Sequence, residues 1–322
     1  MATKSDDAQR WLQHLVEADQ GLDFVRSGGS LLRVASTSTP TAHRSFLSAL
    51  NDFTDQAQVP LLQVSYETCD RLQYPQKVIA AIGETVDFPQ LFRDIAHLIW
   101  RHLGYAGSSV LARDVSAVTG NSLMDLRGEF RAEVRRMLDN GPTLSRDFRS
   151  IVPRILVDGV IDGPHAERGY IEQFRSYLRG LLSARDLYQL GIMKKVTRET
   201  ATSTLRSLLA LYSMTSNPGV VLHLDLRWSS DHDLLSTLDR TVFGPTKQAR
   251  VWIYQWMREL IDTLDRFSST IIIVEVGPSF RDPSFSGRGW GLYDALRLRL
   301  EDGVRPADGD SNLSAPFITF GA

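Results

Sequence analysis

Two histidines and an aspartate are the residues of this sequence with the clearest chemical potential. Imidazoles and carboxylates bind metals and move protons near neutral pH, and His43, His223 and Asp225 supply both types. His223 and Asp225 are two residues apart in the apolar segment 220–226, so on a β-strand their side chains point to the same face. A pocket that holds a metal or another ligand around these three residues is one interpretation. The nearby cluster 231–233 (Asp-His-Asp) is more typical of a helix-capping turn.

A polar segment follows the first apolar run, at the place where a phosphate-binding loop joins a strand to a helix. Such a loop has the pattern G-x-x-x-x-G-K-[ST], because glycines let backbone amides close on phosphate oxygens, the lysine adds charge and the hydroxyl holds magnesium. In that frame the sequence reads Ala35-Ser-Thr-Ser-Thr-Pro-Thr-Ala42. Pro40 has no N–H group, Thr41 has no charge and Ala42 has no oxygen for a metal. The pattern therefore predicts an ordinary polar loop over residues 36–42, without a phosphate role.

The strand that carries Asp225 stands where an ATPase places its magnesium-organising acid. In a working enzyme this Asp is usually followed by a Glu that orients the attacking water. Leu226 takes the place of that Glu here, and a leucine cannot polarise water. Nucleophilic catalysis has no support either, because the sequence lacks a G-x-S-x-G motif and its one cysteine, Cys69, has no histidine beside it in sequence. A single cysteine also excludes an internal disulfide framework.

Three arginines recur at helical spacing in the middle of the sequence. Arg127, Arg131 and Arg135 are four residues apart, so on a helix they form one stripe that could contact the phosphates of a nucleic acid. Glu129 and Glu133 lie on the same predicted helix. That mixture of charges favours a solvated, salt-bridged surface over a nucleic-acid contact.

Apolar runs and turn residues indicate the elements that would position these side chains. Strands are predicted at 31–35, 59–66, 220–226 and 270–276, and helices at 7–25, from about His43, around 252–264 and at 290–301. Residues 88–215 are helical in pattern almost throughout. The initial order of strand, loop, helix and strand is a βαβ unit, which is typical of a parallel sheet. The sequence therefore predicts an α/β fold in which 1–80 and 216–322 form one parallel sheet flanked by helices. Residues 81–215 form a large, mostly helical insertion or lid, and a Pro/Gly/Asp-rich tail ends the chain.

Composition narrows the class of protein. The 322 residues are 43% hydrophobic and 23% charged, which is typical of a globular protein with a full core. With 36 basic and 38 acidic residues the net charge is −2, so no whole-molecule field attracts nucleic acid. The first residues are polar, and no apolar run approaches the roughly 18 residues that span a bilayer. We therefore expect a cytoplasmic protein without a membrane partner.

Five segments of the second half share their order and spacing with one known family. They are LLSARDLYQLG at 181–191, TATSTLRSLLA at 200–210, PGVVLHLD at 218–225, WMRELID at 256–262 and YDALRLRL at 293–300. Over these segments the sequence resembles the ATP-binding protein of BREX-type phage-defence systems, a P-loop ATPase family. The resemblance implies a P-loop NTPase-like fold, with the first strand, loop and helix at the family's phosphate-binding position.

The nucleotide-binding motifs of that family are degenerate in this sequence. His43 and Asp225 match the family pattern, whereas residues 40–42 replace its glycine, lysine and Ser/Thr, and Leu226 replaces its second acid. The resemblance therefore implies a pseudo-ATPase. No cofactor is expected, and ATP with magnesium is not expected to bind.

The function implied by this resemblance is that of a non-catalytic, ATPase-like subunit of a prokaryotic phage-defence or DNA-transaction complex. The subunit would dock to a partner protein, such as an active ATPase, a helicase or a nuclease, and would meet DNA through that complex. Arg299, in the last predicted helix, could reach a partner's phosphates or be an ordinary solvated residue. Two alternatives stay open: an enzyme that uses a metal or ligand pocket around His43, His223 and Asp225, and a nucleic-acid-binding module that uses the arginine stripe.

Overall fold

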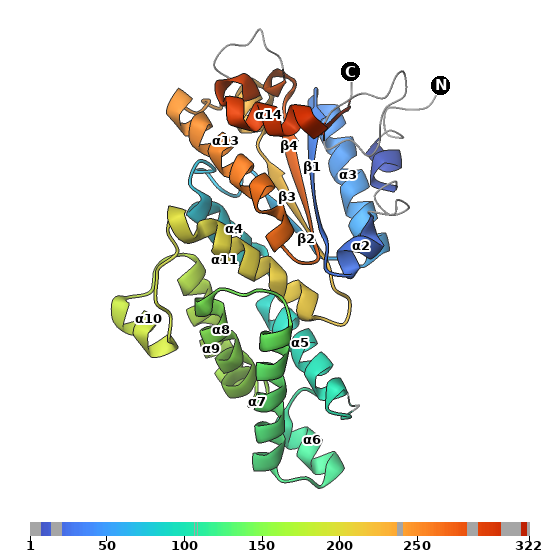
Figure 1. The fold of residues 1–322 in the computed structure, drawn as a ribbon, viewed down its shortest axis with the longest axis vertical. Coiled ribbons are helices and arrows are strands. Elements are labelled where there is room, and N and C mark those ends of the chain that lie inside the picture. Colours follow the sequence, from blue (N-terminus) through green and yellow to red (C-terminus); the bar gives the residue numbers. More distant parts are fainter. Residues whose placement is uncertain are drawn as a thin grey trace. The chain divides into compact units, whose positions relative to one another are not determined.

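The computed structural model describes residues 8–13, 21–105, 107, 109–236, 241–281, 289–303 and 317–320. The chain forms two compact units. The first is made of residues 1–81 and 219–322, and the second of residues 82–218, which are inserted between those two parts. The first unit is an α/β structure, whereas the described elements of the second are all helical (Figure 1).

A parallel sheet of five described strands forms the centre of the first unit. The strands β1 (Ser30–Thr37), β2 (Leu61–Val64), β3 (Val220–Asp225), β4 (Thr270–Val276) and β5 (Phe317–Phe320) lie in the order β2-β3-β4-β1-β5. Because all pairings are parallel, the carboxyl ends of the strands meet at one edge of the sheet. The register aligns Ala35 of β1, Glu275 of β4 and Asp225 of β3 in one row near that edge.

Helices flank this sheet and bury its two faces. The described helices are residues 8–13, α2 (Leu22–Arg26), α3 (Pro40–Ala57), α4 (Pro75–Thr85, which continues into the second unit), α12 (Arg227–Asp231), α13 (Lys247–Asp262) and α14 (Asp294–Gly303). Short 3-10 turns follow at η3 (His232–Leu235), η4 (Leu264–Arg266), η5 (Pro278–Phe280) and η6 (Trp290–Leu292). Helix α3 lies on the sheet through Phe46 and Leu50, and Phe46 stacks on Phe320 with 5.5 Å between ring centroids. This packing fixes the first turn of α3 above the carboxyl edge of the strands.

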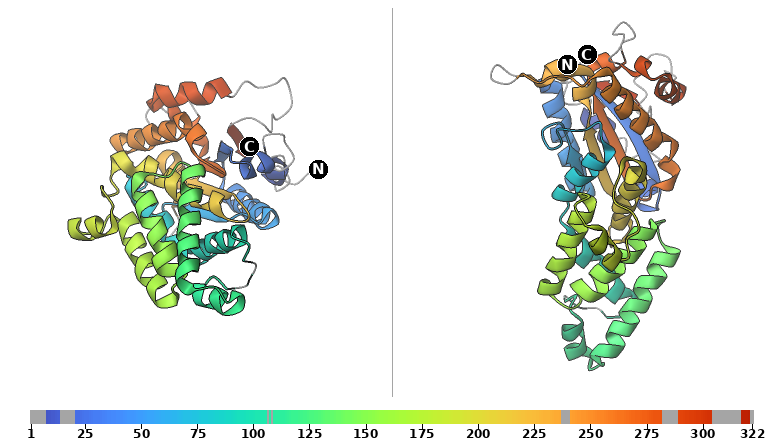
Figure 2. Two further views of the ribbon diagram at one scale, coloured as in Figure 1. Left: turned by 60° about the horizontal axis from the view of Figure 1, so that its bottom comes forward. Right: turned by 90° about the vertical axis from the view of Figure 1, so that its left-hand side faces the viewer.

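The second unit is a set of helices around an aromatic core. The elements are α5 (Phe88–His102), α6 (Ala112–Thr119), α7 (Leu123–Asn140), α8 (Arg146–Arg154), the π-helical segment η1 (Ile155–Val160), α9 (Pro164–Leu178), α10 (Ala184–Leu190), α11 (Arg198–Ala210) and the 3-10 turn η2 (Leu211–Met214). Phe88, Phe92 and Phe148 each contact the ring of Phe174. Figure 2 shows the same helices from two further directions, in teal, green and yellow.

The prediction of a polar loop over residues 36–42 is wrong. Strand β1 continues through Thr37, because Ser36 and Thr37 pair with β5 and extend the ladder. Helix α3 begins at Pro40, where Thr39 caps it by accepting a hydrogen bond from the backbone N–H of Ala42. The connection between strand and helix is therefore only two residues long, Ser38 and Thr39.

The end of the chain also differs from the expectation. The predicted tail contains a strand, β5, in which Phe317 and Phe320 are buried beside β1. The predicted helix at 290–301 begins at Asp294 after a 3-10 turn. Of the predicted helix at 7–25, residues 8–13 and 22–26 are helical, and 14–20 lie outside the described residues. None of the described helices is both long enough and apolar enough to span a membrane.

Candidate functional site

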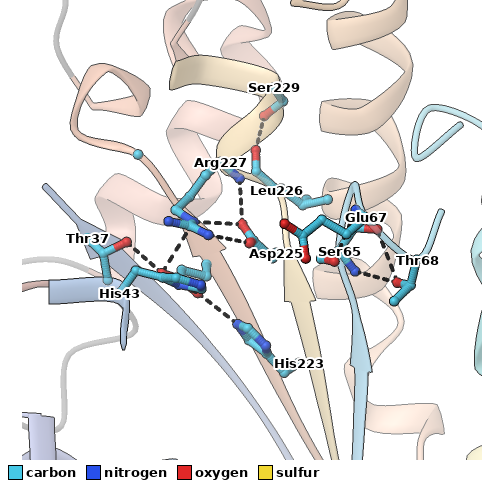
Figure 3. A network of polar contacts seen from close by, with 12 residues as sticks. Thr37, His43, Ser65, Glu67, Thr68, His223, Asp225, Leu226, Arg227 and Ser229 are labelled. Carbon is cyan, nitrogen blue, oxygen red and sulfur yellow. Dashed lines mark hydrogen bonds and ion pairs between the residues drawn. The ribbon is translucent and has the colours of Figure 1, made fainter. Parts of the chain in front are cut away.

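Four polar side chains of the first unit lie close together at the carboxyl edge of the sheet. His223 and Asp225 come from β3 and His43 from the first turns of α3 (Figure 3). Glu275 comes from β4. Glu275 lies at the centre of the group and its side chain is fully buried. The sequence placed three of these residues as candidates, and the structure brings all three to the one acid that it did not single out.

The carboxylate of Glu275 accepts hydrogen bonds from three sides. The hydroxyl of Thr37 donates to Oε1 at 2.5 Å. Nδ1 of His43 lies 2.8 Å from Oε1 and 3.0 Å from Oε2, and Nε2 of His223 lies 3.0 Å from Oε2. Since a carboxylate only accepts, each of these ring nitrogens carries the proton in the ionised network. The contacts connect β1, α3 and β3 to β4 through one side chain.

Asp225 is held by a second buried ion pair. Nε of Arg227 donates to Oδ1 at 2.9 Å and Nη2 donates to Oδ2 at 2.7 Å, while the backbone N–H of Arg227 donates to Oδ1 at 3.1 Å. Nε of Arg227 also lies 3.5 Å from Oε1 of Glu275. Both oxygens of Asp225 are therefore occupied, and the guanidinium joins the two carboxylates into one network.

The network keeps Glu275 ionised. Burial by itself raises the pKa of Glu275, but hydrogen bonds from His223 and His43 and the charges of His223 and Arg227 outweigh it, so this pKa lies well below its usual range. For Arg227, burial lowers the pKa, and the hydrogen bond and charge of Asp225 raise it above the ordinary value. The site therefore holds charged groups in a buried position because each is paired.

A cavity of about 230 Å³ opens beside this network. It is lined by His43, His223, Asp225, Arg227 and the segment 63–68, which is the end of β2 and the turn after it. In that segment the backbone N–H of Ser65 donates to the hydroxyl of Thr68 at 2.9 Å, which closes a turn that also holds Glu67. The ring of Tyr66 stacks on Trp228 with 5.1 Å between centroids. A small polar ligand or an ion would have both imidazole and carboxylate groups within reach here (Figure 3).

Three of the side chains also suit a metal ion. One ring nitrogen of His43 and one carboxylate oxygen each of Asp225 and Glu275 lie within 4.8 Å of one another. Imidazole with two carboxylates is a donor set that binds zinc, manganese or iron. The sequence favoured no metal and offered a ligand trio only as an alternative, with His223 in place of Glu275; His223 instead contacts Oε2 of that acid.

The remaining phosphate-loop positions are structural. Ala35 is fully buried in β1, and Pro40, Thr41 and Ala42 form the first turn of α3. Leu226 is buried directly after β3. All five side chains are uncharged, so none of them places a charge in the cavity.

The neighbouring acidic cluster and the arginines lie elsewhere. Asp231 ends α12 and accepts the backbone N–H of Ser279 at 3.1 and 3.2 Å. Arg299 lies on α14, where its Nε donates to Asp262 of α13 at 2.8 Å and its side chain is 54% exposed. The arginine stripe lies on α7 in the second unit, where Arg127 forms an ion pair with Asp162 and Arg131 lies 3.8 Å from Asp158.

Glu275 was missed because its sequence context points only to a strand. It stands in the β-branched run TIIIVEV, which is the pattern of a fully buried strand. A carboxylate inside such a run is itself a signal, since a buried acid needs partners. Arg227 carries a weaker signal, because its partner is only two residues away in sequence.

No family model, no curated protein and no solved structure matches this chain.

Proposed function

We propose that the first unit is a degenerate, P-loop ATPase-like domain that does not hydrolyse ATP, and that the protein acts as a docking subunit of a prokaryotic phage-defence or DNA-transaction complex. The observation that carries the first half is the two-residue connection between β1 and α3, with the carboxylate of Glu275 next to it. The second half rests on the resemblance of the sequence to a BREX-type ATP-binding protein.

The connection is too short to surround a phosphate. A phosphate loop needs several free backbone N–H groups that point to one place. Only Ser38 and Thr39 lie between the strand and the helix, Pro40 has no N–H, and the N–H of Ala42 already donates to the side chain of Thr39. The ionised Glu275, hydrogen-bonded to Thr37 at the end of β1, would also repel a phosphate.

The groups that would organise magnesium are engaged as well. Both carboxylate oxygens of Asp225 accept hydrogen bonds from Arg227. A metal would have to displace this guanidinium from a site where both partners are buried, which is unfavourable. Leu226 offers no oxygen to an attacking water. These features support an ATPase-like framework without the chemistry of an ATPase.

A domain of this kind can act by binding a partner protein through its surface. The partner that we propose is an active ATPase, a helicase or a nuclease of the same complex, an assignment that rests on analogy of fold and sequence. Arg299 is the candidate side chain for reaching a partner's phosphates, and to do so it would exchange its hydrogen bond to Asp262.

Two measurements test this proposal. Calorimetric titration of the purified protein with MgATP should show no saturable binding below about 1 mM. Co-expression with the products of adjacent genes should yield a stable complex, whose size is measured by light scattering. Micromolar binding of MgATP together with its hydrolysis to ADP would overturn the non-catalytic assignment. A protein that elutes as a monomer with every adjacent gene product would overturn the docking role.

A metal-dependent function is the second candidate, and the convergence of His43, Asp225 and Glu275 within 4.8 Å favours it. Elemental analysis of protein purified without chelators distinguishes the two. Stoichiometric zinc, manganese or iron that is lost in His43→Ala, but kept in His102→Ala, would support the metal site. His102 is a suitable control because it lies 3.3 Å from Glu133 in another histidine–glutamate pair.

A further inference from the structure

The second unit contains a basic groove that the proposed function does not use. Helix α7, helix α8 and segment η1 line a cavity of about 390 Å³. Four arginines and two aspartates contribute to its wall, which gives a surplus of two positive charges: Arg131, Arg135, Arg149, Arg154, Asp139 and Asp158. We call this cavity and its six charged residues the arginine groove.

One wall of the groove is a helix face that packing holds in place. Phe130 and Val134 of α7 are fully buried and Leu138 nearly so. Their burial fixes the rotation of the helix, so Arg131 and Arg135 present their side chains to the groove one turn apart. The cations are therefore positioned by the core of the unit, although they are themselves exposed.

The other wall contains irregular backbone. Pro153 lies inside α8 and has no N–H to donate to the carbonyl of Arg149. The chain then continues in π-helical form over η1. Such π-helical turns are rare and occur often at functional sites. This one brings Val157 and Asp158 to the lining of the groove, next to Arg154 at the end of α8.

The ion pairs inside the groove are loose. Arg131 lies 3.8 Å from Asp158, and Arg149 lies 3.7 Å from Asp139, both beyond the length of a hydrogen bond. The four side chains are between 44% and 73% exposed, and ion pairs of this kind contribute little. An incoming anion can therefore take over the two arginines without breaking a strong interaction.

The other two arginines retain unused donors. Arg135 has no hydrogen bond or ion pair within the part of the chain that the structure describes. Arg154 uses Nη1 to donate to the backbone carbonyl of Gln189, which leaves its other donors for a ligand.

The geometry points to the arginine groove as a binding site for the sugar-phosphate backbone of a nucleic acid. Planar guanidinium groups match the oxygens of phosphate, and several at one place are the usual means of holding such a backbone. This site is separate from the network around Glu275, so it does not depend on whether the first unit binds a nucleotide.

The arrangement favours a repeating polyanion over a single small anion. Arg127, which forms an ion pair with Asp162 outside the groove, continues the same face of α7, so guanidinium groups recur from Arg127 to Arg135 over about 12 Å of helix. The apolar lining consists of Leu138, Pro153 and Val157, without an aromatic ring for a base to stack on. Recognition is therefore of the backbone, without sequence preference, and depends strongly on salt.

Fluorescence anisotropy with a labelled DNA duplex of about 20 base pairs tests the site on the full-length protein, at salt concentrations between about 50 and about 200 mM. The variant Arg131→Ala/Arg135→Ala/Arg149→Ala should bind DNA at least about tenfold more weakly. The plot of the logarithm of the association constant against the logarithm of salt concentration has a negative slope, whose magnitude should decrease by about two to three. Arg101→Ala/Arg113→Ala/Arg185→Ala removes the same charge from exposed positions outside the groove and should change affinity less than about twofold. Circular dichroism melting confirms that each variant is folded.

A gain-of-function variant makes the test independent of any damage to the fold. Asp139→Asn/Asp158→Asn removes the two competing carboxylates, so it should tighten DNA binding severalfold. The proposal is wrong if the wild-type protein does not bind DNA at the lowest salt, or if both triple variants lose the same affinity. Tighter binding of polyglutamate than of DNA would likewise overturn it in favour of an acidic protein partner.

Discussion

Glu275 is the residue on which the candidate site depends. It is fully buried and is contacted by Thr37, His43, His223 and Arg227, which come from four different elements. A buried carboxylate with this many partners is stable only while all of them are present, because each unpaired group would pay the full desolvation penalty. The stability of the first unit and the chemistry of its site are therefore linked in one side chain.

Replacing Glu275 by Gln should destabilise the protein by about 3–5 kcal/mol at neutral pH, since removing one partner leaves buried charges uncompensated. Because the folded-state pKa of Glu275 lies below that of the unfolded chain, its ionisation stabilises the fold fully above about pH 4.3 and progressively less as the pH falls below that value. The difference between wild type and Glu275→Gln should therefore shrink on acidification. Urea unfolding at several pH values measures it, and a difference that grows toward low pH would contradict the assignment.

The pair Asp225–Arg227 should behave as one unit. Arg227→Met leaves Asp225 buried without its partner, and Asp225→Asn leaves the guanidinium without one. A double-mutant cycle should give a coupling energy of at least about 1 kcal/mol, because the two side chains share two hydrogen bonds. Unfolding measurements on the two single variants and the double variant supply the cycle. Additive effects would show that the ion pair has no special role.

At the scale of elements, the connection between β1 and α3 sets what the site can hold. Pairing with β4 and β5 extends β1 to Thr37. The side chain of Thr39 caps α3, which begins at the next residue. Both ends of the loop are thus fixed by ordinary secondary-structure interactions. A longer phosphate-binding loop would require β1 to end earlier or α3 to begin later.

Thr39→Ala should destabilise α3 by about 1 kcal/mol, because it removes the oxygen that accepts the N–H of Ala42. Thr39→Ser keeps that oxygen and should stay within about 0.5 kcal/mol of wild type. Thermal unfolding compares the two. Equal melting temperatures for Thr39→Ala and Thr39→Ser would show that the cap does not stabilise the helix.

Rebuilding the phosphate-loop signature should not create an ATP site. The variant Pro40→Gly/Thr41→Lys/Ala42→Thr restores the glycine, lysine and hydroxyl that end the signature, but the connection keeps two residues and Glu275 keeps its charge. Titration of this variant with MgATP should still show no saturable binding below about 1 mM. Micromolar binding would mean that the wild-type protein lacks only the signature side chains, and that neither the short connection nor Glu275 prevents ATP from binding.

At the scale of the whole molecule, each unit has its own hydrophobic core. In the first unit Trp11, Phe46 and Phe320 pack together, and in the second Phe88, Phe148 and Phe174 do so. Regions with separate cores open as separate cooperative units. A substitution that weakens an ion pair should therefore lower the local stability mainly of the unit that contains it.

Hydrogen exchange followed by mass spectrometry tests this separation. Glu275→Gln should speed amide exchange in strands β1, β3 and β4 and leave α5 and α9 unchanged. Glu133→Gln, which breaks the ion pairs of the buried Glu133 with the exposed His102 and Arg136 in the second unit, should speed exchange in that unit and leave β1, β3 and β4 unchanged. Faster exchange throughout the chain in both variants would show that the two units unfold as one.

The sequence by itself determined the local elements of this protein. The buried strands β3 and β4, the first βαβ unit and the helices of residues 88–215 follow from apolar runs and helical spacing, which depend on near neighbours. The same local information placed His223 and Asp225 on one face of a strand. It also placed the arginines of α7 on one stripe, although not the arginines of α8 that face them across the groove.

Only the tertiary structure decided which groups meet. The hydroxyl of Thr37 and the carboxylate of Glu275 are 238 residues apart in sequence, and parallel pairing of β1 with β4 brings them to 2.5 Å. The length of β1 depends equally on β5, which lies at the far end of the chain. Strand register and pairing order are set by contacts between distant segments, so no periodicity within one segment reports them. For that reason the sequence supplied three residues of the site, and the fold supplied the acid that joins them.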